Sequence, residues 1–533
     1  MFINFSSRHP RHLATPSLLA IALLGAGQAR AQHDPGRNAV RQLAQEKYDA
    51  AAKTLVTKSG RMNSPIEQSE VHFVRMLSAS LQGDGATAFD EAKKAVDGGV
   101  PFGRIAAMPE EAGKALRSAP GYAEWAAGHP LVLTHGPMIG AVTDGSARIW
   151  LRTNGPRSVE VELKAGDKTL RETVTTKAAG DHTGVAAFTG LTPKQKYEVR
   201  ILSDGKPAGS GSFTTTGPAE QAGSYTIVFG GGAGYTAENE RVWKSIAKQK
   251  PDALFLLGDN VYIDDIQSTL TDRYTYHRRQ SQPDWRALVA QTPTYAIYDD
   301  HDFGLNDCVP GPFIDQPPWK RESWDVFREN WANPSYGGGE KQPGCWFDFE
   351  TARVRFFFLD CRYYRDLHGG TMLGPVQKAW LKEALAGSEA EFNVILSSVP
   401  WSAGVKPGSR DTWDGFPAER EELFSFIEKE SINGVVLLSA DRHRLDIRKT
   451  ERPNGYALHD FMSSRLTNVH VHGLTQNAKG STWIYGYNKT PGFAKMTFDT
   501  TKSPATVSCS LFDLDNELLH TTTLSSDQLR HQP

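Results

Sequence analysis

Carboxylate and histidine side chains follow four apolar segments of this chain of 533 residues. Carboxylates and imidazoles that meet where buried strands end are the ligands that hard and borderline metal ions prefer. One such segment alone says little, because Gly-Asp pairs are common in turns and a single aspartate often caps a helix. Together they predict a metal site and metal-dependent hydrolysis. The segments are Gly258-Asp259-Asn260-Val261-Tyr262, Asp299-Asp300-His301-Asp302, Leu359-Asp360-Cys361-Arg362 and Ser439-Ala440-Asp441-Arg442-His443.

Other side chains near these segments are predicted to act on the substrate. Two cations that share a carboxylate activate a bound water near neutral pH and stabilise negative charge on the group that the water attacks. His301 suits protonation of the leaving oxygen, and its alternatives are a third metal ligand or a structural hydrogen bond. Arg362 is predicted to be catalytic because its planar fork matches two oxygens, but it could equally be a buried partner of Asp360. The predicted substrate contacts are Asn260, Tyr274, Arg278 and Asn306.

An α/β region, residues 223–524, must position these side chains. Its apolar segments alternate with helical stretches, and Asp259 lies just past the strand at 253–257, where ligand sites gather in open α/β sheets. Residues 456–524 are strand-like and are predicted to complete the sheets. The other predicted strands are near 225–229, 294–298, 354–359, 392–397 and 434–438, and the predicted helices include 237–248, 374–386 and 417–429.

Two further regions precede the α/β region. Residues 38–128 are rich in Ala, Lys, Glu and Gln with apolar residues at helical spacing, which predicts a small helical domain. Its helix pairs resemble a tetratricopeptide-like unit, which could contact a protein partner. From 131 to 217 apolar and polar residues alternate between Gly, Pro and Asp turns. This pattern predicts a β-sandwich of the fibronectin type III or immunoglobulin kind.

The amino terminus has the layout of a secretory signal. Arg8 and Arg11 precede an apolar stretch at 18–24 and the segment Ala29-Arg30-Ala31. This predicts cleavage after residue 31 and a secreted or periplasmic protein exported by the general secretory route. No later stretch is long and apolar enough to predict a transmembrane helix.

The cysteines and the overall charge narrow the class of protein. The four cysteines show no CxxC spacing, so they predict no zinc framework. Cys308 and Cys345 bracket a loop rich in Pro and Gly and are the predicted disulfide, whereas Cys361 is predicted to be a small buried hydrophobe. The formal net charge of -2 does not favour nucleic-acid binding as the main role.

The order of the motifs resembles the alkaline phosphatase D family of the calcineurin-like metallophosphoesterases. The family's pattern is matched by Gly-Asp-x-x-Tyr from Gly258, by Tyr-x-x-Tyr-Asp-Asp-His-Asp from Tyr295 with Asn306-Asp307 after it, and by Leu-Asp-x-Arg-Tyr-Tyr-Arg from Leu359. Trp413-Asp414-Gly415-Phe416-Pro417-Ala418-Glu419-Arg420 and Ser-Ala-Asp-x-His from Ser439 complete it. The resemblance runs from Leu131 to the late four hundreds, and the helical region lies outside it.

The resemblance implies a two-metal hydrolytic centre on a four-layer α/β/β/α sandwich. Asp259 matches the aspartate that bridges the metals, and Asp300 stands where the superfamily has an asparagine. Asp441 and His443 match residues that supply one ligand to each metal. Tyr262 matches a tyrosine that serves as a phenolate ligand in the iron-containing branch.

One departure from the family bears on the metal. The family places a cysteine after the first strand, but this chain has Gly230-Gly231-Gly232-Ala233-Gly234, in which no side chain can bind metal. Two or more divalent ions with oxygen ligands, such as calcium, magnesium or manganese, are therefore expected, and iron(III) is disfavoured. The vacancy could be filled by backbone or water, or one metal site could be weak or absent.

The sequence thus predicts a secreted phosphoesterase that cleaves phosphomonoesters or phosphodiesters of small or polymeric substrates. One alternative is a degenerate member that binds phosphorylated or glycan ligands without cleaving them, which the glycine run motivates. Another is a phospholipase D-like hydrolase with the same metal site and a different pocket. The number of metal ions per chain distinguishes the two: two ions support the enzyme, and none supports the binding protein.

Overall fold

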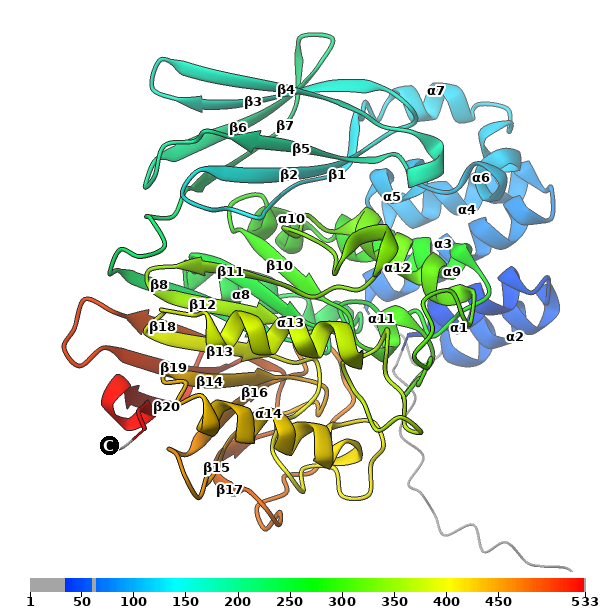
Figure 1. Cartoon of the computed structure of the whole chain (residues 1–533). Coiled ribbons are helices and arrows are strands. Elements are labelled where there is room, and N and C mark those ends of the chain that lie inside the picture. Colours follow the sequence, from blue (N-terminus) through cyan, green and yellow to red (C-terminus); the bar gives the residue numbers. More distant parts are fainter. Residues whose placement is uncertain (1–33, 60–63, 532–533) are drawn as a thin grey trace, which may run out of the picture. The chain divides into compact units, whose positions relative to one another are not determined.

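The computed structural model describes residues 34–59 and 64–531, and Figure 1 shows the path of the chain. The predicted signal segment, residues 1–31, lies outside this range. Within the described range, no helix combines the length and the apolar character that crossing a bilayer requires.

Helices occupy the region between Pro35 and Ala127. The longest of them, α3, begins at a capping box between Ser64 and Glu67, with Pro65 in the first turn. The buried cluster of this region also takes in Tyr274, from helix α9 (Thr269–Ser281) of the α/β region. The helices are α1 (Pro35–Ala44), α2 (Tyr48–Ser59), α3 (Pro65–Leu81), α4 (Gly85–Asp97), α5 (Phe102–Ala106), α6 (Glu110–Arg117) and α7 (Tyr122–Ala127).

Antiparallel sheets follow. The order β1–β2–β5 forms one sheet and β4–β3–β6–β7 another. Inward side chains of both sheets, such as Ile149 and Val161, share one buried cluster. Assignment to the immunoglobulin or fibronectin type III kind stays a prediction. The strands are β1 (Leu133–Gly140), β2 (Ser146–Thr153), β3 (Ser158–Ala165), β4 (Lys168–Thr175), β5 (Thr183–Thr189), β6 (Lys196–Ser203) and β7 (Lys206–Thr214).

Two mixed sheets form the centre of the α/β region. Of the described strands, six form the order β10–β9–β8–β18–β19–β20 and seven form β11–β12–β13–β14–β16–β15–β17. The late strands join both sheets, as predicted. Their bounds are β8 (Ser224–Gly230), β9 (Ala253–Leu257), β10 (Thr294–Ile297), β11 (Phe347–Thr351), β12 (Val354–Phe358), β13 (Phe392–Leu396), β14 (Val435–Ser439), β15 (Leu445–Thr450), β16 (Leu458–Ser463), β17 (Thr482–Tyr487), β18 (Gly492–Asp499), β19 (Thr506–Asp513) and β20 (Leu518–Ser525).

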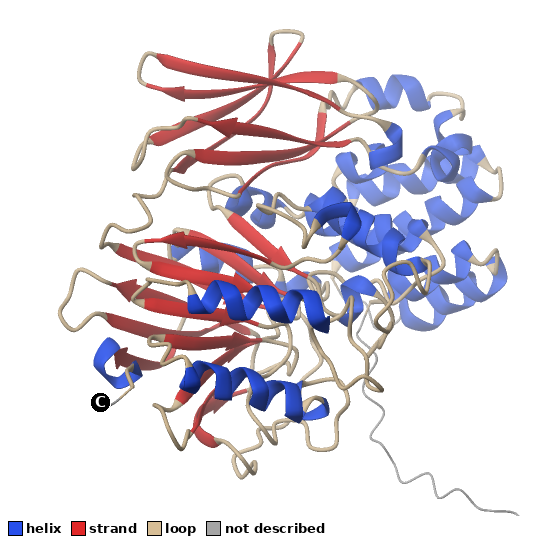
Figure 2. Cartoon of the chain, in the orientation of Figure 1, coloured by secondary structure: helices blue, strands red, loops and turns tan. Residues whose placement is uncertain are grey.

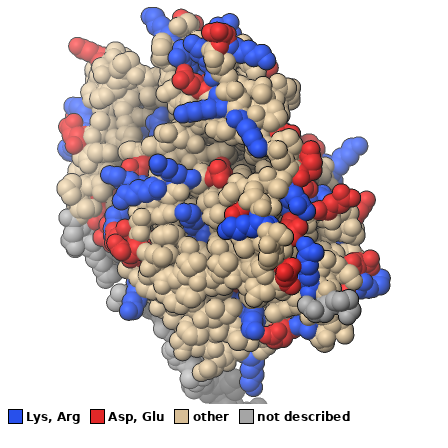
Figure 3. Space-filling model, turned by 90° about the vertical axis from the view of Figure 1, so that its left-hand side faces the viewer, with Lys and Arg blue, Asp and Glu red and all other residues tan. Residues whose placement is uncertain are grey.

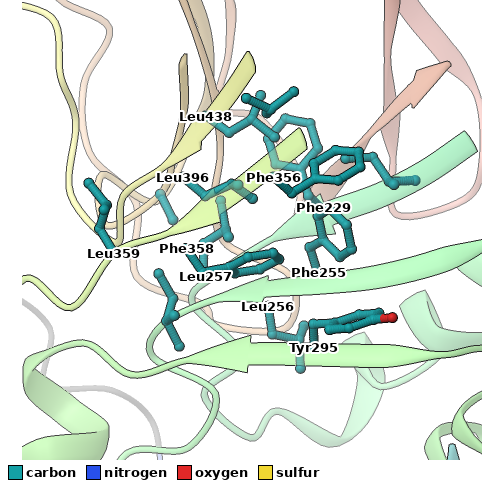
Figure 4. Packing of buried hydrophobic residues seen from close by; sticks show 14 of the residues in the cluster. Phe229, Phe255, Leu256, Leu257, Tyr295, Phe356, Phe358, Leu359, Leu396 and Leu438 are labelled. Atoms are coloured by element: carbon teal, nitrogen blue, oxygen red, sulfur yellow. The ribbon is translucent and has the colours of Figure 1, made fainter. Parts of the chain in front are cut away.

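Aromatic side chains join the two mixed sheets (Figure 4). The ring of Phe255 on β9 meets those of Phe356 and Phe358 on β12 edge-on, with centroids 5.1 and 4.9 Å apart. This contact holds the carboxyl ends of parallel strands from both sheets in one region. The residues that follow those strands can therefore meet.

Helices cover the mixed sheets. Figure 2 shows α13 and α14 running along the seven-stranded sheet, and Trp380 of α13 lies edge-on to Phe357 of β12. Pro is at the start of both helices, and for α14 this start signal is part of the prediction. Besides α9, the helices are α8 (Val242–Lys248), α10 (Pro283–Val289), α11 (Asp300–Phe303), α12 (Trp319–Asn330), α13 (Gly374–Ala386) and α14 (Pro417–Lys429).

The predicted disulfide is wrong. All four cysteines are free thiols. Cys345 is fully buried in the core of the α/β region, whereas Cys308 lies in the loop after α11 with its Sγ atom close to Gly304. The predicted burial of Cys361 is confirmed, and its Sγ atom lies 3.3 Å from Oγ of Ser397.

Candidate metal centre

The loop after β9 turns sharply to bring Asp259 inward. Gly258 and Asp259 both have positive φ, +97° and +53°. A Cβ atom on residue 258 would lie 2.5 Å from Cβ of Asp299, so only glycine fits there. This close approach places the loop after β9 against the loop after β10.

Asp302 ties these two loops together. Its carboxylate accepts hydrogen bonds from the backbone amides of Asp299 and Val261, both at 3.0 Å. The bonds fix the first turn of α11, which carries Asp300 and His301. The short helix therefore presents two predicted site residues to Asp259.

Three loops bring four of the five predicted metal ligands together: Asp259, Tyr262, Asp300 and His443. Asp259, Asp300 and His301 each offer one ligand atom, and these atoms lie within 4.8 Å of one another. The hydroxyl of Tyr262 donates to Oδ2 of Asp259 at 3.0 Å and lies 3.0 Å from Nε2 of His443. His443 comes from the loop after β14, so this centre joins both mixed sheets.

Several ligand atoms of the centre are buried without a hydrogen-bond partner in the described part of the chain: Oδ1 of Asp259, Oδ2 of Asp441 and Nδ1 of His443. Leaving a buried polar atom unpaired costs about 1–3 kcal/mol. Burial also raises the pKa of Asp259 well above its usual value and lowers that of His443 well below. Carboxylate and phenol oxygens and imidazole nitrogens with free lone pairs are suitable metal ligands.

His301 is held by a carboxylate. Its Nδ1 atom lies 2.5 Å from Oδ1 of Asp264, and its ring packs against Tyr262 with centroids 4.3 Å apart. Burial alone would lower the pKa of His301, but the carboxylates of Asp300 and Asp264 raise it well above its usual value. Asp264 in turn accepts from Nη1 of Arg37, on helix α1, at 2.6 Å.

Arg362 is fully buried among carboxylates. Its Nε atom donates to Asp299 at 2.5 Å, and Nη1 donates to Asp411 at 2.6 Å. Nη2 lies 3.4 Å from Oδ1 of Asp300. Asp360, the alternative partner, accepts the backbone amide of Arg362 instead. The side chain is thus placed to orient Asp300.

A second group of charges lies beside Asp300. Asp411 accepts hydrogen bonds from Arg362, from Arg365 and from Lys406, the last at 2.9 Å. Lys406 also reaches Asp307 at 3.3 Å, and its side chain is 23% exposed. These cations already balance Asp411, so we do not assign it a metal.

Tyr274 and Arg278 are not brought to the centre. Arg278 forms an ion pair with Asp34, and its Nη1 atom donates to the hydroxyl of Tyr274 at 3.1 Å. That hydroxyl donates to Glu70 at 3.2 Å. Both side chains are buried against the helical region and serve to attach it.

The remaining predicted contacts differ in their environment. The amide of Asn260 donates to the carbonyl of Ile297 at 2.8 Å, so it supports the loop after β9. Asn306 is exposed, close in sequence to Asp307.

Sequence reasoning missed several residues of the centre, because they lie on loops without a strand-end pattern. Two of them have a local signal: in Val469-His470-Val471-His472 the valines are exposed and the histidines are half-buried. One ring nitrogen from each of His443, His470 and His472 lies within 4.8 Å of the others. The other missed residues are Asp264, Lys406 and Asp411.

Comparison with known proteins decides the family. A model described as PhoD-like phosphatase matches residues 227–501, just over half of the chain. The chain belongs to the PhoD-like phosphatase family. This confirms the resemblance drawn from the motifs. A second model, a domain of unknown function (DUF7800), matches residues 131–211.

One curated relative matches this chain in sequence. Alkaline phosphatase D of Bacillus subtilis (strain 168) is 26% identical over 310 residues, 48% of this chain and 52% of that protein. The match therefore spans about half of that relative's length.

Two solved structures share the fold. A structure of PhoD matches with a TM-score of 0.63 at 18% identity, over 74% of this chain and 90% of that one. Purple acid phosphatase PPD1 from yellow lupin (Lupinus luteus) seeds matches with a TM-score of 0.57 at 14% identity, over 74% and 75%.

Proposed function

We propose that this chain is a secreted, metal-dependent phosphoesterase that hydrolyses phosphomonoesters or phosphodiesters on a four-layer α/β/β/α sandwich. The observation that carries the proposal is the meeting of Asp259, Asp300 and His301 from two loops, with Tyr262 and His443 against Asp259. Membership of the PhoD-like phosphatase family supports the reaction class. Secretion rests on the signal-like residues 1–31.

The side chains divide into those that hold cations and those that face the substrate. Asp259, Tyr262, Asp300, Asp441 and His443 would hold two ions. A bound pair of cations supplies a water of lowered pKa and neutralises charge on the phosphoryl oxygens. Asp259 is the natural shared ligand, because its carboxylate lies between the α11 loop and the loop after β14.

His301 and Lys406 would act on the ester itself. His301 lies at the edge of the ligand group with its side chain 12% exposed, and Asp264 fixes Nδ1 so that Nε2 is left to protonate the leaving oxygen. Lys406, partly exposed at the rim, is a cation for the phosphoryl group. Arg362 acts through Asp300, since its own fork is buried.

Substitution of the shared ligand tests the proposal. Asp259→Asn should lose nearly all hydrolysis of an aryl phosphate and an aryl phosphodiester, together with bound metal, because the bridging charge is gone. Asp252→Asn is the matched control, since Asp252 is exposed at the opposite end of β9 and should leave both unchanged.

The substrate panel also separates the alternatives. A phosphatidylcholine analogue in the panel reports a phospholipase D-like activity. Tight binding of phosphorylated or glycan ligands by a protein that turns over no ester with any metal would favour a degenerate binder. Full activity of Asp259→Asn would show that another group bridges the ions.

A further inference from the structure

Two histidines outside the predicted ligand set point at the centre. His470 and His472 lie in the loop between β16 and β17, and their ring centroids are 4.6 Å apart. The ring of His443 lies 5.3 Å from His470 and 5.4 Å from His472. The neighbours Val469 and Val471 are 36% and 43% exposed, whereas the two histidines are half-buried and lie against the ring of His443.

The glycine run after β8 explains why this loop can approach. The amide of Leu466 donates to the carbonyl of Gly231 at 3.0 Å, and that of Asn468 donates to Gly232 at 3.2 Å. A Cβ atom on residue 232 would lie 2.9 Å from the backbone nitrogen of Arg465. The space in which a side chain of the run would stand is thus filled by the histidine-bearing loop.

We propose that His443, His470 and His472 form a three-histidine site for a borderline divalent cation of the zinc class. Imidazole nitrogens are preferred ligands of such ions, and three protein ligands leave one position open. Ligands of a tetrahedral zinc ion lie about 3.3 Å apart, so nitrogens now within 4.8 Å need to close by at most about 1.5 Å. Two of the three residues, His470 and His472, are on the loop between β16 and β17, and the third follows β14.

The site adjoins the carboxylates of the centre. Nε2 of His443 lies 3.8 Å from Oδ2 of Asp259 and 3.0 Å from the hydroxyl of Tyr262. One position is then rich in nitrogen ligands and the other, beside Asp300, in oxygen ligands, so the two ions should differ. Binding of the ion stands on the histidine geometry, whereas its use in ester hydrolysis rests on the proposed function.

Arg442 competes with the ion. Its Nη1 atom donates to Nε2 of His472 at 3.3 Å, and it lies 4.0 Å from Oδ2 of Asp441. A metal ion bound to Nε2 of His472 must displace the guanidinium of Arg442. The displaced guanidinium can turn to the carboxylate of Asp441. Removal of the charge by Arg442→Gln should therefore tighten metal binding.

The test titrates chelator-treated full-length protein with Zn²⁺ and with Co²⁺, whose visible absorption reports its ligands. His470→Gln and His472→Gln should each weaken one bound ion by at least about 100-fold and alter the cobalt spectrum. His520→Gln, a partly exposed histidine on β20, is the matched control and should match wild type. Equal stoichiometry, affinity and spectra in all variants would overturn the site.

X-ray absorption of zinc-loaded wild type gives a second measurement that needs no variant. Three imidazoles around one zinc ion support the site, and one imidazole overturns it. The outcomes also separate this inference from the proposed function. A three-histidine zinc ion in a protein that hydrolyses no ester contradicts the function alone, whereas ester hydrolysis with one imidazole per zinc contradicts the site alone.

Discussion

At the scale of residues, Tyr262 connects the two halves of the centre. Its hydroxyl contacts both Asp259 and His443, which come from different sheets. Asp259 can share its charge between two ions, but the phenol can serve only one. Substitution of Asp259 should therefore reduce activity and bound metal more than substitution of Tyr262.

Tyr262→Phe should lower kcat by about tenfold and leave more than half of the bound metal, because a phenol is an optional ligand for hard divalent ions. Asp259→Asn, measured in parallel, should lose nearly all activity and nearly all bound metal. Steady-state kinetics with elemental analysis of the same samples checks this. A Tyr262→Phe protein as dead and metal-free as Asp259→Asn would assign the phenol an essential ligand role.

The sequence identified the candidate ligands that follow strands, and missed residues of the candidate centre whose positions depend on long-range contacts. Asp259, Asp300 and His443 stand directly after apolar strands, so their meeting follows from the sheets. His470 and Asp411 lie on loops whose paths depend on packing across the molecule. Arg278 looked available in sequence, but its partner Asp34 is 244 residues away.

At the scale of elements, helix α1 reaches the centre through one side chain. Arg37 donates to Oδ2 of Asp264, whose Oδ1 holds His301. Helices α13 and α14 and strand β9 have their predicted bounds, because local apolar pattern and helix-start signals specify them. The docking of α1 carries no such local signal, so the sequence could not reveal that the helical region supports the site.

Arg37→Met should lower kcat by about tenfold with little change in KM, because His301 loses its orientation while substrate contacts remain. Arg37→Lys should recover part of the loss. Arg41→Met, one turn later on α1 and partly exposed, is the matched control. An unchanged kcat in Arg37→Met would show that α1 has no influence on His301.

At the scale of the whole molecule, buried charged residues attach the helical region to the α/β region, whereas the surface charges form no field of one sign. Figure 3 shows basic and acidic side chains interspersed on the face that it displays, in keeping with the net charge of -2. Buried ion pairs instead join the helical region to α9. The pair between Asp34 and Arg278 is among them, with side chains 5% and 4% exposed.

Asp34→Asn should destabilise the protein in a pH-dependent way. Burial alone would raise the pKa of Asp34, but Arg278 and Arg37 lower it from 3.8 to about 2. A lowered pKa means that the stabilisation is present above about pH 4 and is lost as the pH falls toward 2, with a size of about 2 kcal/mol.

Denaturant unfolding of wild type and Asp34→Asn across this range checks the prediction. The difference in unfolding free energy should be full at pH 7 and shrink below pH 4. Asp49→Asn, a substitution in the first turn of α2, serves as the control and should show no comparable change. A difference that stays constant with pH would contradict the ion pair as its source.

The central claim is that the joined loops hold catalytic metal ions. The rate of aryl phosphate hydrolysis, followed while metal ions are added back to chelator-treated protein, tests it most directly. We predict almost no turnover without metal and full recovery at a stoichiometry of two ions per chain. Turnover that survives complete metal removal, or that no added ion restores, would contradict the account.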